Sequence, residues 1–419
     1  MTSGNLYLVV AVIGALSTVN GYRPFARSGF VSLPACIAGV LTSELPLQII
    51  AVQVLASAVF VAVGAVRSPA GVGGAALSVA SWIGLVGLHR TAQRSRDVLE
   101  QSLRDGLGAD YADRIRSRVP ADDGRPLTLL EVLRPNRGLR KRYCNERDLA
   151  YGDAGVRNQL DIWRHPDLPL DARAPVLLQL HGGAWVMGRK DDQAGPLLTH
   201  LAERGWVCVS ANYRLSPAAT WPDQIVDVKQ AIAWVRANIA DHGGDPAFIA
   251  VTGGSAGGHL AALAALSPND PGFQPGFTSS DTSVQAAVPL YGLYDLTNLR
   301  GGTRADTIKF LAKKVFKFDP DADPTAWAGA SPICRVRSDS PPFFVVHGTN
   351  DSFLPVEQAR AFAQDLREAV PLTTAFAELP RTQHAFDFFS SVRVHHTVRA
   401  IARFLTYAHE TAATARREP

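Results

Sequence analysis

The sequence predicts an α/β protein with a mostly parallel central sheet, helices on both faces and a helical cap, preceded by a transmembrane helical region. From residue 143 onward, short β-branched runs alternate with longer amphipathic stretches, which is the pattern of strands joined by crossover helices. At 419 residues the chain is long enough for both parts. Before residue 89 charge is almost absent, and the only Asp, Glu, Lys or Arg residues are Arg23, Arg27, Glu44 and Arg67.

Two uncharged segments in this first part, residues 45–66 and 70–88, are long enough to cross a bilayer as helices. A helix needs about 20 apolar residues for this. Ser68, Pro69 and Gly71 predict a turn between the two segments. The sequence therefore predicts a helical hairpin in the membrane.

A shorter apolar run, residues 5–19, is a candidate third span. It resembles the core of a signal peptide, but no positive side chain precedes it, so we expect no cleavage. Together these segments predict a membrane-embedded helical region over residues 1–90. The alternative is a buried helical pair over residues 45–88 inside a larger soluble core, although uncharged runs of this length are uncommon there.

The distribution of arginines predicts the orientation of this region. The turn of the hairpin carries only Arg67, and the two flanks carry Arg23, Arg27, Arg90, Arg94 and Arg96. Because positive charge favours the cytoplasmic side, both flanks are expected there. We therefore expect a multi-pass protein of the cell membrane whose second part lies in the cytoplasm.

Composition excludes several classes of function. The formal net charge of +4 is small and dispersed, so we expect no nucleic-acid partner. The cysteines form no CxxC pair, which predicts neither a disulfide framework nor a zinc site. We expect no metal and no cofactor. The cysteines are Cys36, Cys144, Cys208 and Cys334.

The second part is expected to be one α/β domain over residues 143–410. It follows a polar segment over 91–142, either a connector or a cap, and precedes a polar tail over 411–419. Sites in such sheets form at the carboxyl edge of the strands. The predicted strands are residues 160–163, 176–180, 207–211, 248–252, 286–290, 343–347 and 374–379. The predicted helices are residues 194–204, 222–240, 256–266, 356–368 and 392–408.

A candidate nucleophile, Ser255, lies in the sequence Gly-Gly-Ser-Ala-Gly directly after the strand at 248–252. This fits G-x-S-x-G, in which the serine occupies a strained turn between a strand and a helix. Small neighbours let the strand and helix approach each other, and the helix N-terminus favours negative charge in front of the serine. Taken alone, the motif could equally be a glycine-rich turn with a surface serine.

A second glycine motif, His-Gly-Gly-Ala-Trp, follows the strand at 176–180. Backbone N–H groups in such a loop can point at a substrate oxygen. The N–H groups of Gly182, Gly183 and Ala256 are therefore predicted to form an oxyanion hole. His181 is expected to brace this loop and not to act as a base. The presence of both motifs at the predicted strand ends makes each more specific.

The base is expected after the nucleophile in the chain, with the acid between them. His384 lies in a loop after the strand at 374–379, from which it can reach a serine at the sheet edge. His259 lies inside the helix that follows Ser255, and His347 ends a strand. The other histidines after Ser255 lie on or just beyond the last helix: His395, His396 and His409. His384 is therefore the predicted base.

The predicted acid is Asp351, which follows the strand at 343–347 and can accept a hydrogen bond from the imidazole. Asp339 precedes that strand, Glu357 opens a helix, and Asp387 is too close to His384 in the sequence. The three side chains predict attack by the serine on a carbonyl carbon, proton transfer through the histidine, and release of an acyl-enzyme by water.

These residues resemble the hormone-sensitive-lipase-like branch of the α/β-hydrolases, especially bacterial membrane-linked carboxylesterases or lipases. The likeness covers about residues 160–405 and includes Asn-Tyr-Arg-Leu at 212–215, Gly-Asp-Pro at 244–246 and Tyr-Gly-Leu-Tyr-Asp-Leu at 291–296. Ala184 stands where the family often has a third glycine, and Gly254 where it often has an acidic residue.

The resemblance implies hydrolysis of carboxylic esters, on short- to medium-chain acyl esters or on lipids. His-Gly-Gly followed by a varied residue and Trp also resembles arylformamidase-type relatives, so amide or formamide cleavage stays open. A membrane-anchored binding protein without activity is the third alternative.

A cap is predicted near residues 297–330, in the insertion before the strand at 343–347. Apolar residues with helical spacing alternate there with lysines, which predicts a basic amphipathic helix. The helix could be a lid that touches anionic lipid, or a cap with a solvated lysine face. The apolar residues are Ile308, Leu311, Ala312, Val315 and Phe316, and the lysines are Lys309, Lys313, Lys314 and Lys317.

Overall fold

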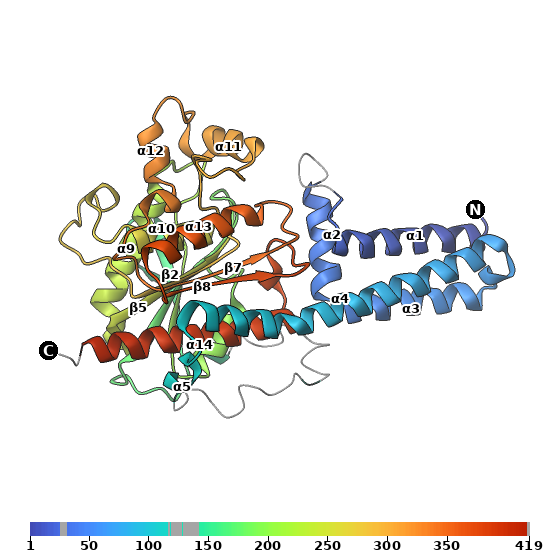
Figure 1. The fold of residues 1–419 in the computed structure, drawn as a ribbon, viewed down its shortest axis with the longest axis horizontal. Coiled ribbons are helices and arrows are strands. Elements are labelled where there is room, and N and C mark those ends of the chain that lie inside the picture. The colour runs from blue at the N-terminus through green and yellow to red at the C-terminus, as the bar shows by residue number, and fades with distance from the viewer. Residues whose placement is uncertain (26–31, 116–117, 119–127, 129–141, 417–419) are drawn as a thin grey trace.

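The structure is a computed structural model that describes residues 1–25, 32–115, 118, 128 and 142–416. A bundle of N-terminal helices projects from a larger α/β body, and one long helix runs from the bundle onto the body (Figure 1). The predicted fold class is confirmed: a mixed sheet lies between two layers of helices.

The sheet of the body has eight strands in the order β1-β2-β4-β3-β5-β6-β7-β8. Strands β1 and β2 and strands β2 and β4 pair antiparallel, and all other neighbours are parallel. The central strands are buried on both sides, which explains their continuous apolar sequences. The strands are β1 (Cys144–Ala150), β2 (Gln159–Trp163), β3 (Ala174–Leu180), β4 (Val207–Ala211), β5 (Gly244–Gly254), β6 (Ala286–Leu290), β7 (Phe343–Gly348) and β8 (Thr374–Leu379).

Two hydrophobic cores lie on the two faces of this sheet. Helices α9, α10 and α13 pack on one face together with the cap. Helices α8 and α14 and the second half of α4 pack on the other face. The helices are α8 (Gly195–Ala202), α9 (Asp223–Asn238), α10 (Ala256–Leu266), α13 (Val356–Ala369) and α14 (Val392–Ala415).

The cap lies between β6 and β7 and covers the top of the body in Figure 1. Its predicted helix is real, although its second half is a π-helical turn. Phe316 stacks on the buried Trp327 at 4.2 Å between ring centroids, so the apolar side of the helix faces the body. The four lysines are exposed. The cap elements are α11 (Ala305–Leu311), the turn Ala312–Phe316 and α12 (Pro324–Gly329).

The bundle contains two helices that are long and apolar enough to cross a membrane, α1 and α4. Helices α2 and α3 pass the same criterion only together, and they are bent by 96° at Leu45, so the described residues offer up to three spans. The predicted span at 45–66 is shorter in the structure, because Pro46 begins α3 and the chain turns at Gly64. The bundle helices are α1 (Ser3–Tyr22), α2 (Ser32–Glu44), α3 (Pro46–Ala62) and α4 (Pro69–Leu107).

Helix α4 crosses the boundary that was predicted at residue 90. Its polar second half carries Leu99 and Leu103, which are buried against the body. Gly106 lets the helix approach β8, since an added Cβ would lie 2.5 Å from the Ala375 Cα atom. The predicted connector is therefore partly a helix of the body, continued by α5 (Tyr111–Ile115), and most of its remainder lies outside the described residues. At the other end, α14 runs into the predicted polar tail.

Candidate active site

Ser255 lies in the turn between β5 and α10, at the carboxyl edge of the sheet. Its backbone has φ 58° and ψ −119°, a conformation that non-glycine residues rarely adopt. The turn needs small residues: a Cβ on Gly257 would lie 2.2 Å from the Leu180 carbonyl oxygen, and one on Gly253 would lie 2.5 Å from the backbone of Gly257. The strand, turn and helix around Ser255 thus have the geometry of a nucleophile elbow.

The structure brings together the three side chains that the sequence singled out. The Ser255 Oγ atom lies 2.9 Å from His384 Nε2. On the other side of the imidazole, Nδ1 lies 2.7 Å from the Asp351 Oδ2 atom. Both distances are those of hydrogen bonds. The three residues follow β5, β8 and β7, so the parallel strands deliver them to one edge of the sheet.

Asp351 is held as a buried carboxylate. Its Oδ1 atom accepts hydrogen bonds from the backbone N–H groups of Phe353 (2.9 Å) and Leu354 (2.8 Å). Its Oδ2 atom also lies 3.2 Å from His347 Nε2. Burial alone would raise the pKa of Asp351, but the charge of His384 and the hydrogen bonds from both histidines hold that pKa well below its ordinary value. The sequence analysis did not assign His347 this contact.

The glycine loop after β3 lies beside Ser255, since a Cβ on Gly182 would lie 3.3 Å from the Ser255 Cβ atom. The Gly182 N–H donates to the Gln193 Oε1 atom at 2.7 Å, so it is already occupied by a protein acceptor. This differs from the predicted role of Gly182 as a donor to substrate. Within the described residues, no hydrogen bond occupies the N–H groups of Gly183, Ala184 or Ala256.

Several buried residues brace this loop. The His181 ring stacks on Tyr213 at 4.2 Å between centroids, and the Tyr213 hydroxyl donates to the His181 carbonyl at 2.8 Å. Burial lowers the pKa of His181 to about 4, so the ring is neutral at pH 7. Further along the loop, Lys190 is buried and its ammonium contacts the carboxylates of Asp161 (2.6 Å) and Asp148 (2.7 Å). Gln193 and Lys190 carried no signal in a motif and were not predicted.

Tyr291, the first residue after β6, fills the space behind the triad. Its ring lies 4.8 Å from the His384 ring, and its hydroxyl donates to the partly buried carboxyl of Asp387. Burial raises the pKa of Asp387. A Cβ on Gly254 would lie 2.4 Å from the Tyr291 hydroxyl oxygen, so a side chain at this position would require Tyr291 to move.

Among the described residues, neither the other histidines nor the possible metal ligands form a second candidate site. His259 Nε2 lies 2.8 Å from the Ala330 carbonyl oxygen, which ties the helix behind Ser255 to the segment after the cap. Among the described residues, no group of three or more His, Cys, Asp or Glu side chains could hold a metal ion.

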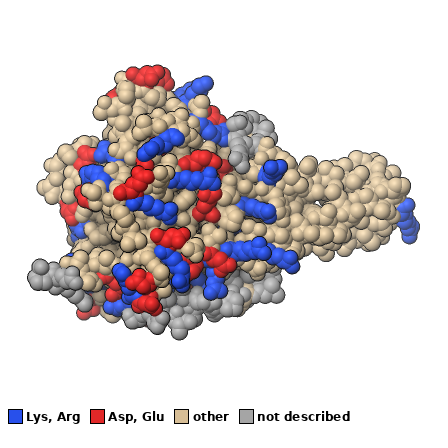
Figure 2. All heavy atoms as spheres, in the orientation of Figure 1, with Lys and Arg blue, Asp and Glu red and all other residues tan. Residues whose placement is uncertain are grey.

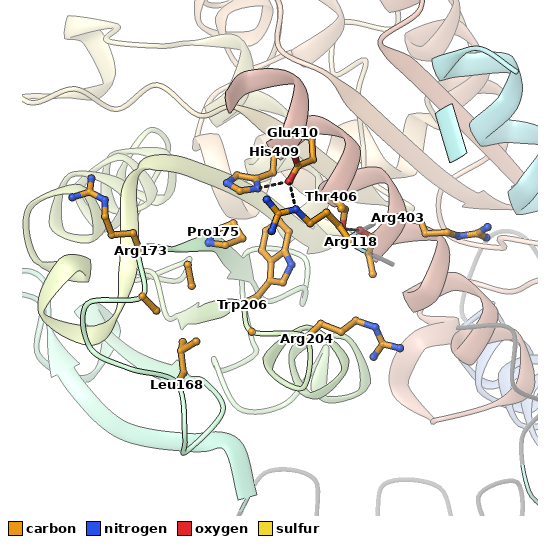
Figure 3. A pocket seen from close by; sticks show the side chains of 14 residues that line it. Arg118, Leu168, Arg173, Pro175, Arg204, Trp206, Arg403, Thr406, His409 and Glu410 are labelled. Atoms are coloured by element: carbon orange, nitrogen blue, oxygen red, sulfur yellow. Dashed lines mark hydrogen bonds and ion pairs between the residues drawn. The ribbon is translucent and has the colours of Figure 1, made fainter. Parts of the chain in front are cut away.

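A cavity of about 320 Å³ lies at the opposite edge of the sheet, beside Ala174 at the start of β3 and Trp206 before β4 (Figure 3). Arginines line it, but in Figure 3 the guanidinium groups of Arg173 and Arg204 point in different directions. Arg118 is ion-paired with Glu410 at 3.1 Å. Because this cavity lies at the amino ends of the strands and Ser255 follows the carboxyl end of β5, the cavity is separate from the candidate active site.

Comparison with known proteins gives consistent relatives. Residues 160–366 match the BD-FAE family model. The probable carboxylic ester hydrolase LipM of Mycobacterium tuberculosis is 46% identical over 411 residues, which cover 96% of this chain and 93% of LipM. Esterase LipQ of the same organism is 48% identical over 330 residues, or 77% of each chain.

Two solved structures resemble the α/β body. Esterase 2 of Thermogutta terrifontis with bound butyrate has a TM-score of 0.54 and 26% identity, over 62% of this chain and 92% of that one. A truncated carbohydrate esterase from gut microbiota has a TM-score of 0.51 and 26% identity, over 62% of this chain and 98% of that one. Because LipM shares sequence with 96% of this chain and LipQ with 77%, this protein belongs to the hormone-sensitive-lipase-like family of α/β-hydrolases and is a carboxylic ester hydrolase.

Proposed function

We propose that Ser255, His384 and Asp351 are the catalytic triad of this esterase and that hydrolysis passes through an acyl-enzyme on Ser255. The observation that carries this proposal is the continuous chain of hydrogen bonds, 2.9 Å from Ser255 to His384 and 2.7 Å from His384 to Asp351. A serine hydroxyl is a weak nucleophile until a base accepts its proton, and here a base is within reach.

The reaction then follows in two steps. The Ser255 Oγ atom attacks the ester carbonyl carbon while His384 Nε2 accepts its proton, and the imidazolium returns that proton to the leaving alcohol. Water, deprotonated by the same nitrogen, then attacks the acyl-enzyme and releases the acid. Asp351 stays ionised throughout because its pKa is low, so it stabilises the imidazolium and fixes the imidazole tautomer.

The oxyanion of each tetrahedral intermediate would be bound by backbone N–H groups. We infer that Gly183 and Ala256 serve, together with Ala184, because no other described residue accepts from them. Gly183 and Ala184 have φ values of 122° and 52°, so the loop turns sharply beside Ser255. Gly182 would act indirectly, since its bond to Gln193 fixes the loop. One oxyanion donor is typically worth about 2.7–4 kcal/mol in the barrier.

The substrate is proposed to be an ester with a short- to medium-chain acyl group, or a lipid. Esterase 2 of T. terrifontis, which shares the fold, holds butyrate. Met187 lies beside Gly183 and is 64% exposed, which provides an apolar rim near the oxyanion loop. A series of p-nitrophenyl esters of increasing chain length would locate the preferred acyl group as the maximum of kcat/KM.

The body is proposed to lie on the cytoplasmic side of the cell membrane. Arg23 directly follows α1 and Arg90 lies in the middle of α4, whereas Arg67 lies in the turn between α3 and α4, at the end of the bundle that holds the N-terminus in Figure 1. The arginine bias therefore favours the body on the inner side. Protease added to sealed cells should leave the body intact. Cleavage of the body by external protease would show that it lies on the outer side.

The proposed triad is tested by Ser255→Ala. The variant should keep the melting temperature of the wild type but lose ester hydrolysis and labelling by a fluorophosphonate probe. An active Ser255→Ala protein would refute the assignment. Matched ester and anilide substrates separate the alternatives: faster anilide cleavage would make the protein an amidase with the same triad.

A further inference from the structure

The bundle contacts the loop that carries Asp351. The side-chain amide of Asn350 donates to the carbonyl oxygens of Gly21 and Tyr22, at 3.0 Å each. These are the last carbonyls of α1, which have no partner inside their own helix. Asn350 directly precedes Asp351, so the end of α1 and the acid loop are joined by two hydrogen bonds.

The loop that carries His384 contacts the bundle as well. The Gln383 Oε1 atom accepts from the backbone N–H groups of Ser352 (2.7 Å) and His384 (2.9 Å), which ties the acid and base loops together. The same side chain packs on α2: a Cβ on Gly39 would lie 3.2 Å from Gln383 Nε2. Gly39 thus allows close contact between the α2 backbone and the base loop.

A buried carboxylate on α2 fixes both ends of the base loop. Glu44 accepts a hydrogen bond from the Ser391 hydroxyl at 2.7 Å and forms an ion pair with Arg393. Arg393 also donates to the Pro380 carbonyl at 3.5 Å. All three polar side chains are buried. Because Pro380 and Ser391 lie before and after His384, the whole loop is held through Glu44.

A contribution to the stability of α2 does not explain why a buried glutamate occupies position 44. Glu44 is the last residue of α2, where the helix dipole disfavours negative charge. Burying an ion pair removes both charges from water, so well-packed apolar residues are often at least as stable. What the pair does provide is a directional link between the bundle and the base loop.

We propose that helices α1 and α2 hold the loops of Asp351 and His384 in place for catalysis and that Glu44 is a positioning residue for His384. Glu44 acts through Arg393 and Ser391, while the end of α1 holds the acid loop through Asn350. This inference rests on the proposed roles of Ser255, His384 and Asp351. A consequence is that the body depends on an intact bundle for the rate of ester hydrolysis.

The test is Glu44→Gln in the full-length protein, assayed with p-nitrophenyl butyrate. The expected loss is about 10- to 100-fold in kcat, the size of effect that follows when a catalytic group is misplaced by about an ångström. KM should change less than about threefold, because Glu44 does not contact the proposed substrate position. Glu44→Asp keeps the charge and should recover part of kcat.

The matched control is Glu100→Gln. Glu100 on α4 pairs with Arg403 on α14 at 2.6 Å, so it also links the N-terminal helices to the body, but it touches neither catalytic loop. Its kcat should stay within about twofold of the wild type, as expected for a partly exposed pair. An equal loss of kcat in Glu100→Gln would mean general docking and would overturn the positioning role.

A second variant separates folding from positioning. Glu44→Leu with Arg393→Met removes both buried charges, so it should keep a melting temperature near that of the wild type. Its kcat should still fall as in Glu44→Gln. Wild-type kcat in this folded double variant overturns the proposal even if Glu44→Gln does not fold. Activity in Ser255→Ala would instead overturn the proposed triad, so the two failures are distinguishable.

Discussion

The bundle and the body are built with opposite distributions of polarity. In the body, apolar side chains are inside and charged ones cover the surface, whereas the projecting bundle shows almost no charge in Figure 2. The outer faces of the bundle helices carry exposed apolar residues, for example Ile13 at 59%, Leu55 at 68% and Ile83 at 69%. Between the helices lie polar contacts, such as the 2.8 Å hydrogen bond of Thr18 with Ser81.

This inversion is expected when lipid replaces water as the solvent. Helices in a bilayer gain nothing from burying apolar side chains, so they associate through small residues and polar contacts. Gly74 shows the close approach, because an added Cβ there would lie 3.2 Å from the Leu8 backbone nitrogen. The pattern argues against a buried helical pair in a soluble core.

The largest effect is expected at Asp351, the buried carboxylate of the proposed triad. Asp351→Asn should lower kcat by about 10⁴-fold, because a neutral amide cannot stabilise the imidazolium and favours the wrong tautomer. The melting temperature of the variant should stay close to that of the wild type. Steady-state kinetics with a p-nitrophenyl ester measures the loss. Activity within tenfold of the wild type would remove Asp351 from the triad.

The next effect concerns charge on the outside of the bundle. Leu55→Arg places a cation at the middle of α3, where insertion into a bilayer is disfavoured by about 2.5–3.5 kcal/mol. The protein in the membrane fraction should fall sharply. The matched control is Val156→Arg, since Val156 is 66% exposed on the body and a charge there stays in water. Equal membrane recovery of both variants would contradict a lipid-facing α3.

A smaller effect tests the helix that joins the two regions. Gly106→Ala introduces a methyl group 2.5 Å from the Ala375 Cα atom in β8, so α4 must move away from the sheet. We expect a loss of about 1–3 kcal/mol in the free energy of unfolding, measured by denaturant titration. Gly195→Ala is the control, because no atom lies within 4 Å of the added Cβ, and it should be neutral or slightly stabilising.

The polarity contrast also explains what the sequence could predict. Strands β4, β6 and β8 have the predicted limits, because short, mainly apolar runs are a local signal. Strand β1 was not predicted: it reads Cys-Asn-Glu-Arg-Asp-Leu-Ala and is mostly exposed at the sheet edge. The change from apolar to polar residues near residue 89 was interpreted as the end of the membrane-embedded region and the start of a connector. It marks instead where one continuous helix, α4, passes from the apolar bundle onto the body.

The candidate site also contains residues that the sequence could predict and residues that it could not. The sequence placed Ser255, Asp351 and His384 at strand ends of one sheet edge, and the topology brings them together there. Gln193 and Glu44 could not be found, because their roles arise from contacts between segments far apart in the chain. Glu44 and Arg393, for example, are 349 positions apart. Only the packed structure brings such partners together.

A pH dependence of stability is also expected in the body. Lys229 is buried, and its ammonium donates to the carbonyl oxygens of Ala264 (2.8 Å) and Ser267 (2.6 Å), at the end of the helix that begins after Ser255. Burial lowers the pKa of Lys229 from 10.5 to about 7. Below pH 7 this lysine is protonated in both the folded and the unfolded chain, so the unfavourable burial of its charge is fully present.

Between pH 7 and about pH 10 the unfolded chain binds more protons at this lysine than the folded one, so the free energy of unfolding rises with pH. Lys229→Met has no group that titrates there. The stability of the wild type relative to Lys229→Met should therefore increase from pH 7 to pH 9, measured by denaturant titration at each pH. A difference that stays constant or shrinks would show that the buried lysine keeps its charge, with the two carbonyls at the end of α10 stabilising the ammonium.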